Sequence, residues 1–123
     1  MILDQQSLKT KDIVYAFTLN SEELPIRTFT IWNAKKTCLQ FFDSPDQILL
    51  MMNREKLKEA TDLELSDFAL FMFCVVLLCQ FYKISFNVLL SVELAERMDR
   101  LPSMYAQVWK EVYEYSSKHT ERI

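Results

Sequence analysis

The sequence predicts a single α+β domain in which an N-terminal three-stranded antiparallel meander packs against a C-terminal bundle of about four helices. Apolar residues alternate with a period of two before about Asp43 and follow helical spacing after it. The chain has 123 residues, 50% of them hydrophobic, which is enough for one hydrophobic core and too little for two. We therefore expect one domain over residues 1–123, divided into an arm at 1–11, the meander at 12–42 and the helical part at 44–119.

The strands of the meander are predicted from this alternation. Larger apolar side chains occupy every second position from Ile13 to Leu19, and threonines alternate with Phe29 and Ile31 in the segment 27–31. Both patterns are typical of half-buried strands. A third strand is expected at 37–42. Because three strands with one apolar face are only marginally stable alone, we expect the helices to cover that face.

Capping signals predict where the helices begin. In the segment 44–47, the hydroxyl of Ser44 can cap a helix, Pro45 suits the first helical position and Asp46 places an acid in the first turn. Thr61 and Glu64 have the spacing of a capping box. Since the chain has no glycine, Asn53, Asn87 and the stretch 83–85 are expected to end helices in the left-handed conformation that glycine usually supplies. The helices are predicted over 45–59, 61–82, 86–100 and 103–118, and the second and third form either two helices or one bent helix.

The second predicted helix is apolar on all sides. One face of its helical wheel carries Leu65, Phe68, Met72, Val76 and Cys79, and the opposed face carries Leu70, Cys74, Leu77 and Phe81. Such a helix lies at the centre of a domain, contributes one half of an interface between chains, or spans a membrane. A span needs about 20 apolar residues, and polar residues follow position 79, which argues against a membrane. The opposed face is therefore our candidate surface for a partner protein or a second copy of the chain.

Composition excludes several other classes of function. Without glycine no phosphate-cradling loop can form, and the single histidine, His119, stands close to the end of the chain. A net charge of -3 with no basic stripe argues against nucleic-acid binding. The three cysteines lack metal-binding spacing, so we expect buried, reduced thiols, a cytoplasmic location and no cofactor.

Two pairs of glutamates form the one arrangement with an enzymatic pattern, Glu93-x-x-Glu96 and Glu111-x-x-Glu114. Four carboxylates at this spacing on two antiparallel helices would hold Mg²⁺. The pattern is similar to the paired E-x-x-E and E-x-x-D motifs of the all-α nucleotide pyrophosphohydrolases of the MazG type, although the fourth acid here is Glu rather than Asp. The helical wheel turns Glu111 and Glu114 away from the apolar stripe that contains Trp109, and ion pairs of Glu93 and Glu96 with the arginines four residues later account for the first pair.

The sequence thus predicts a small intracellular, non-enzymatic protein-binding module, such as an adaptor, inhibitor, immunity protein or secretion chaperone. Its expected partner is another protein or a second copy in a homodimer. The alternative is a Mg²⁺-dependent nucleotide pyrophosphohydrolase that uses the four glutamates.

Overall fold

A computed structural model describes residues 12–20, 24–34 and 36–123. The predicted arm at 1–11 lies outside the described residues. The chain is α+β, as predicted, and the described part forms one mixed sheet of five strands with five α-helices. The strand order is β2-β3-β1-β4-β5, with antiparallel pairing except between β4 and β5. The strands are β1 (Ile13–Asn20), β2 (Gln40–Ser44), β3 (Gln47–Asn53), β4 (Ser85–Leu90) and β5 (Thr120–Arg122).

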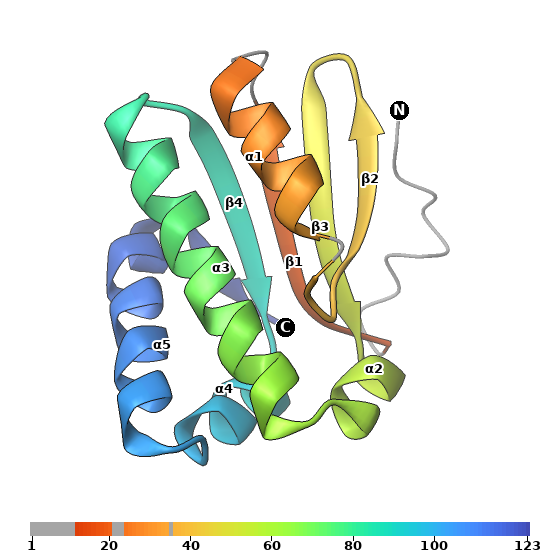
Figure 1. Cartoon of the computed structure of the whole chain (residues 1–123), viewed down its shortest axis with the longest axis vertical. Helices are drawn as coiled ribbons and strands as arrows, with labels where there is room; N and C mark the ends of the chain where they lie inside the picture. The colour runs from red at the N-terminus through yellow and green to blue at the C-terminus, as the bar shows by residue number, and fades with distance from the viewer. Residues whose placement is uncertain (1–11, 21–23, 35) are drawn as a thin grey trace.

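The longer helices lie together on one face of this sheet, and the two short helices lie at its lower end (Figure 1). Among the helices, α3 has the greatest length, with 20 residues. A short 3-10 turn, η2 (Ser117–His119), leads from the last helix into β5. The helices are α1 (Leu24–Ala34), α2 (Arg54–Glu59), α3 (Asp62–Phe81), α4 (Val92–Asp99) and α5 (Ser103–Ser116).

The central strand β1 organises the core. Strands β3 and β4 pair with β1 on either side. Phe17 lies opposite Leu50 of β3 and opposite Val88 of β4. Because side chains alternate along a strand, Tyr15 and Phe17 join the main cluster under the helices. Their neighbours on the other face of the sheet form a second, smaller cluster that comprises Ile13, Ala16, Leu49 and Met51.

Segment 27–31, predicted as a strand, is the middle of α1, and this prediction is wrong. The alternation of threonines with apolar residues also fits a helix, because Ile26 and Thr30 lie one turn apart and both are fully buried. The Thr30 hydroxyl donates to the Ile26 carbonyl at 2.7 Å, which satisfies this polar group inside the helix. The predicted meander over 12–42 is therefore replaced by β1, α1 and part of β2.

Segment 45–59, predicted as one helix, contains strand β3 followed by the short helix α2. The residues that resembled a helix start form the turn of the β2–β3 hairpin, where Ser44 pairs with Gln47 and donates to its carbonyl at 3.1 Å. Proline and aspartate suit the centre of a turn as well as a helix start. Asn53 then caps α2 by accepting from the Lys56 amide at 2.8 Å.

Segment 86–100, predicted as one helix, divides into β4 and α4. Along β4 the burial alternates, with Phe86, Val88 and Leu90 turned to the core. Ser91 ends the strand and caps α4 by accepting from the Leu94 amide. The predicted helical part at 44–119 is therefore interrupted by two strands, β3 and β4, that complete the sheet around β1.

The remaining two helices follow the prediction closely. Helix α3 begins with the expected capping box, in which Thr61 accepts from the Glu64 amide at 3.1 Å and Glu64 accepts from the Thr61 amide at 3.2 Å. Helix α5 directs Trp109 and Val112 into the core. The Trp109 ring lies 6.1 Å from the Tyr15 ring and 5.4 Å from the Phe68 ring, so one aromatic cluster joins β1, α3 and α5.

Helix α3 ends in a Schellman motif without glycine. Lys83 adopts the left-handed conformation with φ 57, as expected for the stretch 83–85. The same prediction is wrong for Asn53, which caps the start of α2, and for Asn87, which lies within β4. The Ile84 amide donates to the Cys79 carbonyl at 2.8 Å and the Lys83 amide donates to the Gln80 carbonyl, which is the hydrogen-bond pattern of the motif. The turn redirects the chain from α3 into β4.

The Trp109→Ala variant should lower the free energy of unfolding by about 3–5 kcal/mol, because it removes a ring from the centre of the core. Trp109 is 4% exposed, whereas Trp32 on α1 is 72% exposed. The matched control Trp32→Ala should change stability by less than about 0.5 kcal/mol. Urea unfolding followed by circular dichroism measures both, and equal effects of the two variants would contradict this core.

The Lys83→Gly variant should raise the free energy of unfolding by about 0.5–1 kcal/mol, because glycine occupies the left-handed region without a Cβ clash. Lys83→Ala keeps the Cβ and should give no such gain, which separates backbone strain from loss of charge. A destabilised glycine variant in thermal unfolding would show that the strain is absent.

Candidate functional site

Helix α3 is buried along one side only. A helix of its length extends for about 30 Å, and it crosses the sheet between α1 and α5 (Figure 1). The residues directed at the sheet, Leu65, Met72 and Cys79, are each at most 1% exposed. These three positions are seven residues apart and belong to the inner face that the sequence predicted. The single layer of helices leaves the opposite side of α3 at the surface.

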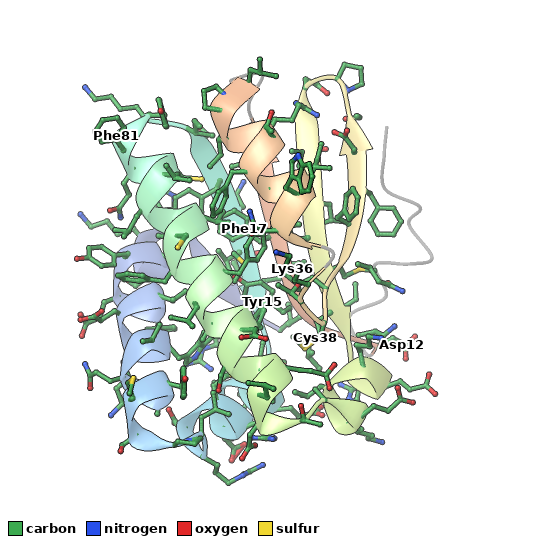
Figure 2. All side chains as sticks on the ribbon, in the orientation of Figure 1. Asp12, Tyr15, Phe17, Lys36, Cys38 and Phe81 are labelled. Atoms are coloured by element: carbon green, nitrogen blue, oxygen red, sulfur yellow. The ribbon has the colours of Figure 1, made fainter. Side chains whose placement is uncertain are left out.

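The four residues predicted as a partner or oligomer face all lie on this exposed side. Leu70 is 42% exposed, Leu77 37% and Phe81 78%, and Cys74 is also exposed. Figure 2 shows Phe81 at the C-terminal end of α3, at the edge of the molecule and far from the labelled core residues Tyr15 and Phe17. The structure therefore brings the four residues together on one apolar surface of the chain.

Two further residues of this surface were missed by the sequence analysis. Leu63, which is 70% exposed, and Asp67, also exposed, extend the same side of α3 toward its first turn. The signal was present in the sequence, since Leu63, Leu70 and Leu77 recur every seven residues. We call the complete set the outer stripe; it consists of Leu63, Asp67, Leu70, Cys74, Leu77 and Phe81.

A groove beside the outer stripe widens the surface toward α1. Its volume is about 360 Å³, and within it the rings of Phe29 and Phe71 stack with their centroids 6.0 Å apart. Lys36 follows α1 at the edge of this groove, on the same side of the molecule as α3 (Figure 2). The groove is lined by Phe29, Asn33, Lys36, Thr37, Asp67, Leu70, Phe71 and Cys74.

The thiols divide between the core and this surface. All three cysteines are free; Cys38 and Cys79 are buried as predicted, but Cys74 is exposed, so the prediction that it is buried is wrong. Burial raises the pKa of the Cys38 thiol to about 11 and that of the Cys79 thiol to about 12. Cys74 escapes burial because it lies five residues before Cys79, which places the two side chains on opposed sides of the helix.

The four glutamates of the alternative hypothesis are distributed over separate places. Glu93 pairs with Arg54, whose Nε donates to it at 2.8 Å. Glu93 and Glu96 line a cavity at α4, whereas Glu114 lines a different one beside Trp109. In the described part of the chain, no group of three or more acidic, histidine or cysteine side chains is placed to hold a metal ion.

The ion pairs and the fold differ further from what the glutamate pattern implied. Arg97 pairs with Asp62 at the start of α3, so Glu93 and Arg97 each bind a group on another element rather than each other along α4. The resemblance to pyrophosphohydrolases implied an all-α fold, but this chain is built on a five-stranded sheet. His119 is exposed in η2, where its ring lies 4.4 Å from that of Phe86.

Comparison of the chain with models of protein families, with curated proteins and with solved structures finds no match. Within the described residues, none of the helices combines the length and the apolar character needed to cross a bilayer.

One thiol should react quickly with a disulfide reagent at pH 8, and two should react only when the protein unfolds. Cys74 is exposed, whereas Cys38 and Cys79 are buried and their raised pKa values keep them protonated at this pH. The assay is run at low protein concentration. Cys74→Ser should remove the rapid phase, and a rapid phase that survives in this variant would contradict the burial of the other two thiols.

Proposed function

We propose that the protein is a non-enzymatic protein-binding module that engages another protein or a second copy of itself through the outer stripe of α3. Adaptors, inhibitors, immunity proteins and secretion chaperones act in this way. The proposal depends on one observation, the contrast between the two sides of α3. The side toward the sheet is fully buried, and the leucines and Phe81 of the opposite side are between 37% and 78% exposed.

Exposed apolar residues are common singly, but a continuous patch of them marks an interaction site on many proteins. The outer stripe is continuous because its members recur every three or four residues, the spacing that places side chains on one side of a helix. Five of its six members are apolar. The groove lined by Phe29 and Phe71 adjoins the outer stripe. A partner would therefore contact both the side chains of the stripe and the groove beside them.

This surface suits a partner helix better than an extended peptide. Recognition by strand addition needs a free sheet edge, whereas the outer stripe offers side chains at helical spacing and no backbone hydrogen bonds. A helix laid along α3 would bury leucines from successive turns together. The acidic groups that the enzyme alternative requires stay apart, and we propose no second function.

Site-specific photo-crosslinking in the native host tests the proposal. In the Phe81→benzoylphenylalanine variant, the photoreactive ring stands on the outer stripe; Met104→benzoylphenylalanine places it at a residue of α5 that is 70% exposed. We expect a defined covalent adduct from position 81, identified by mass spectrometry, and no adduct of the same mass from position 104. Adding Leu63→Glu to the first variant should suppress the adduct.

Equal adducts from the two positions, or none from position 81, would contradict a binding role for this surface. Thermal unfolding of each variant within a few degrees of the parent shows that the substitutions leave the fold intact. Leu63 and Phe81 suit the test because both are exposed, so changing them removes few contacts inside the chain.

A further inference from the structure

The outer stripe has the spacing of a coiled-coil seam. Its members follow one another at intervals of four, three, four, three and four residues, which is the alternation of positions a and d in a heptad. Leucine occupies every d position, namely Leu63, Leu70 and Leu77, and the a positions hold Asp67, Cys74 and Phe81. The f positions, on the far side of a heptad, are the buried residues Leu65, Met72 and Cys79. One helix thus has two apolar faces, an inner one buried within the chain and an outer one at the surface.

We propose that the outer stripe binds a second copy of this chain, with the two α3 helices packed side by side and antiparallel. This inference rests on the proposed function and names its partner. In an antiparallel pair, each a residue of one helix meets a d residue of the other. The stripe satisfies this rule against itself about a twofold axis that passes on the outer side of α3, midway between Leu70 and Cys74.

At this register the contacts of the stripe match layer by layer. Phe81 meets Leu63 of the partner subunit, and Cys74 meets Leu70 of the partner subunit. The layer between these two places Asp67 beside the partner's Leu77, and a carboxylate beside an apolar side chain makes this the weakest layer of the three. The twofold axis repeats each layer, so all six members of the stripe are used. A surface that complements itself in this way produces a closed symmetric dimer.

Charge selects the antiparallel arrangement over the parallel one. A parallel pair would set Asp67 directly against Asp67 of the partner subunit in an apolar seam, where like charges are destabilising. In the antiparallel pair the two aspartates lie about 15 Å apart along the axis, beyond the screening length of about 8 Å at physiological salt. The exposed Lys83 at the end of α3 then lies beside the partner's first turn, which carries Asp62 and Glu64.

The seam is short, so the dimer should be reversible. From Leu63 to Phe81 it extends for about 27 Å, and its six residues per subunit are fewer than the roughly 20–30 per side of a standard interface. The association should therefore be measured by sedimentation velocity over protein concentrations from about 1 μM to 1 mM. The rate at which a reagent labels Cys74 should fall over the same range, because the thiol becomes part of the seam.

A charge exchange between the terminal layers tests both the partner and its direction. Leu63→Glu and Phe81→Lys should each weaken dimerisation about 100-fold, because each buries a charge against an apolar side chain. The double variant should recover to within about 10-fold of the parent, since the antiparallel register brings the new carboxylate of one subunit against the new ammonium of the other. The control Met104→Glu should leave the dissociation constant unchanged.

Oxidative crosslinking through the central layer gives an independent readout. The parent chain should form no disulfide-linked dimer under mild oxidation, because Cys74 faces Leu70 of the partner subunit. The Leu70→Cys variant should crosslink efficiently to Cys74 of the partner subunit, and Cys74→Ser in the same chain should abolish the product. A disulfide dimer of the parent through Cys74 would show parallel packing and overturn the antiparallel register.

The antiparallel dimer and the binding role of the outer stripe can fail separately in these experiments. A chain that stays monomeric at 1 mM, or a double variant that remains as weak as the single ones, overturns the antiparallel dimer. If position 81 still crosslinks to a different protein in the host, the binding role of the outer stripe stands without self-association. If neither self-association nor site-specific crosslinking occurs, both fail.

Discussion

The burial of β1 is the constraint on which the rest of the structure depends. This strand pairs on both sides, and its Tyr15 ring contacts the rings of Phe68 on α3 and Trp109 on α5. Burial raises the pKa of Tyr15 far above its ordinary range, so the phenol stays neutral inside the cluster. The aromatic rings of β1 point to one face of the sheet only. Because α3 and α5 contact these rings, both helices lie on that face.

A single helical layer has a direct consequence for α3. The helix is rich in apolar residues around its whole circumference, yet a sheet below and one helix on each side contact only part of it (Figure 1). The side farthest from the sheet stays in water with Leu63, Leu70, Leu77 and Phe81 exposed. Since exposed apolar area is unfavourable in water, the apolar character of this side is the observation on which the proposed binding role depends.

Sequence reasoning predicted the elements whose signals are local and missed those decided by tertiary pairing. The capping box at Thr61 and the apolar stripe around Trp109 identified α3 and α5, and the alternation from Ile13 identified β1. The turn residues at 44–47 suit a helix start and a hairpin equally, and pairing of β3 with β1 decides between them. The helical wheel grouped Leu70, Cys74, Leu77 and Phe81 on one face of α3 and left open whether the chain itself covers them. Leu63 was missed, although the recurrence of leucine every seven residues places it on the same face.

Proximity between Leu63 and Phe81 tests the central claim most directly. Within one chain these residues lie at opposite ends of α3, about 27 Å apart, far beyond the range of a nuclear Overhauser effect. In a dimer mixed from isotopically labelled and unlabelled chains, filtered spectra record only contacts between subunits. The antiparallel seam predicts an intermolecular effect between the Leu63 methyl groups and the Phe81 ring. A nuclear Overhauser effect between Leu63 and Leu63 of the partner subunit would contradict the antiparallel seam. The absence of any effect between subunits, at concentrations where the chain is associated, would contradict it as well.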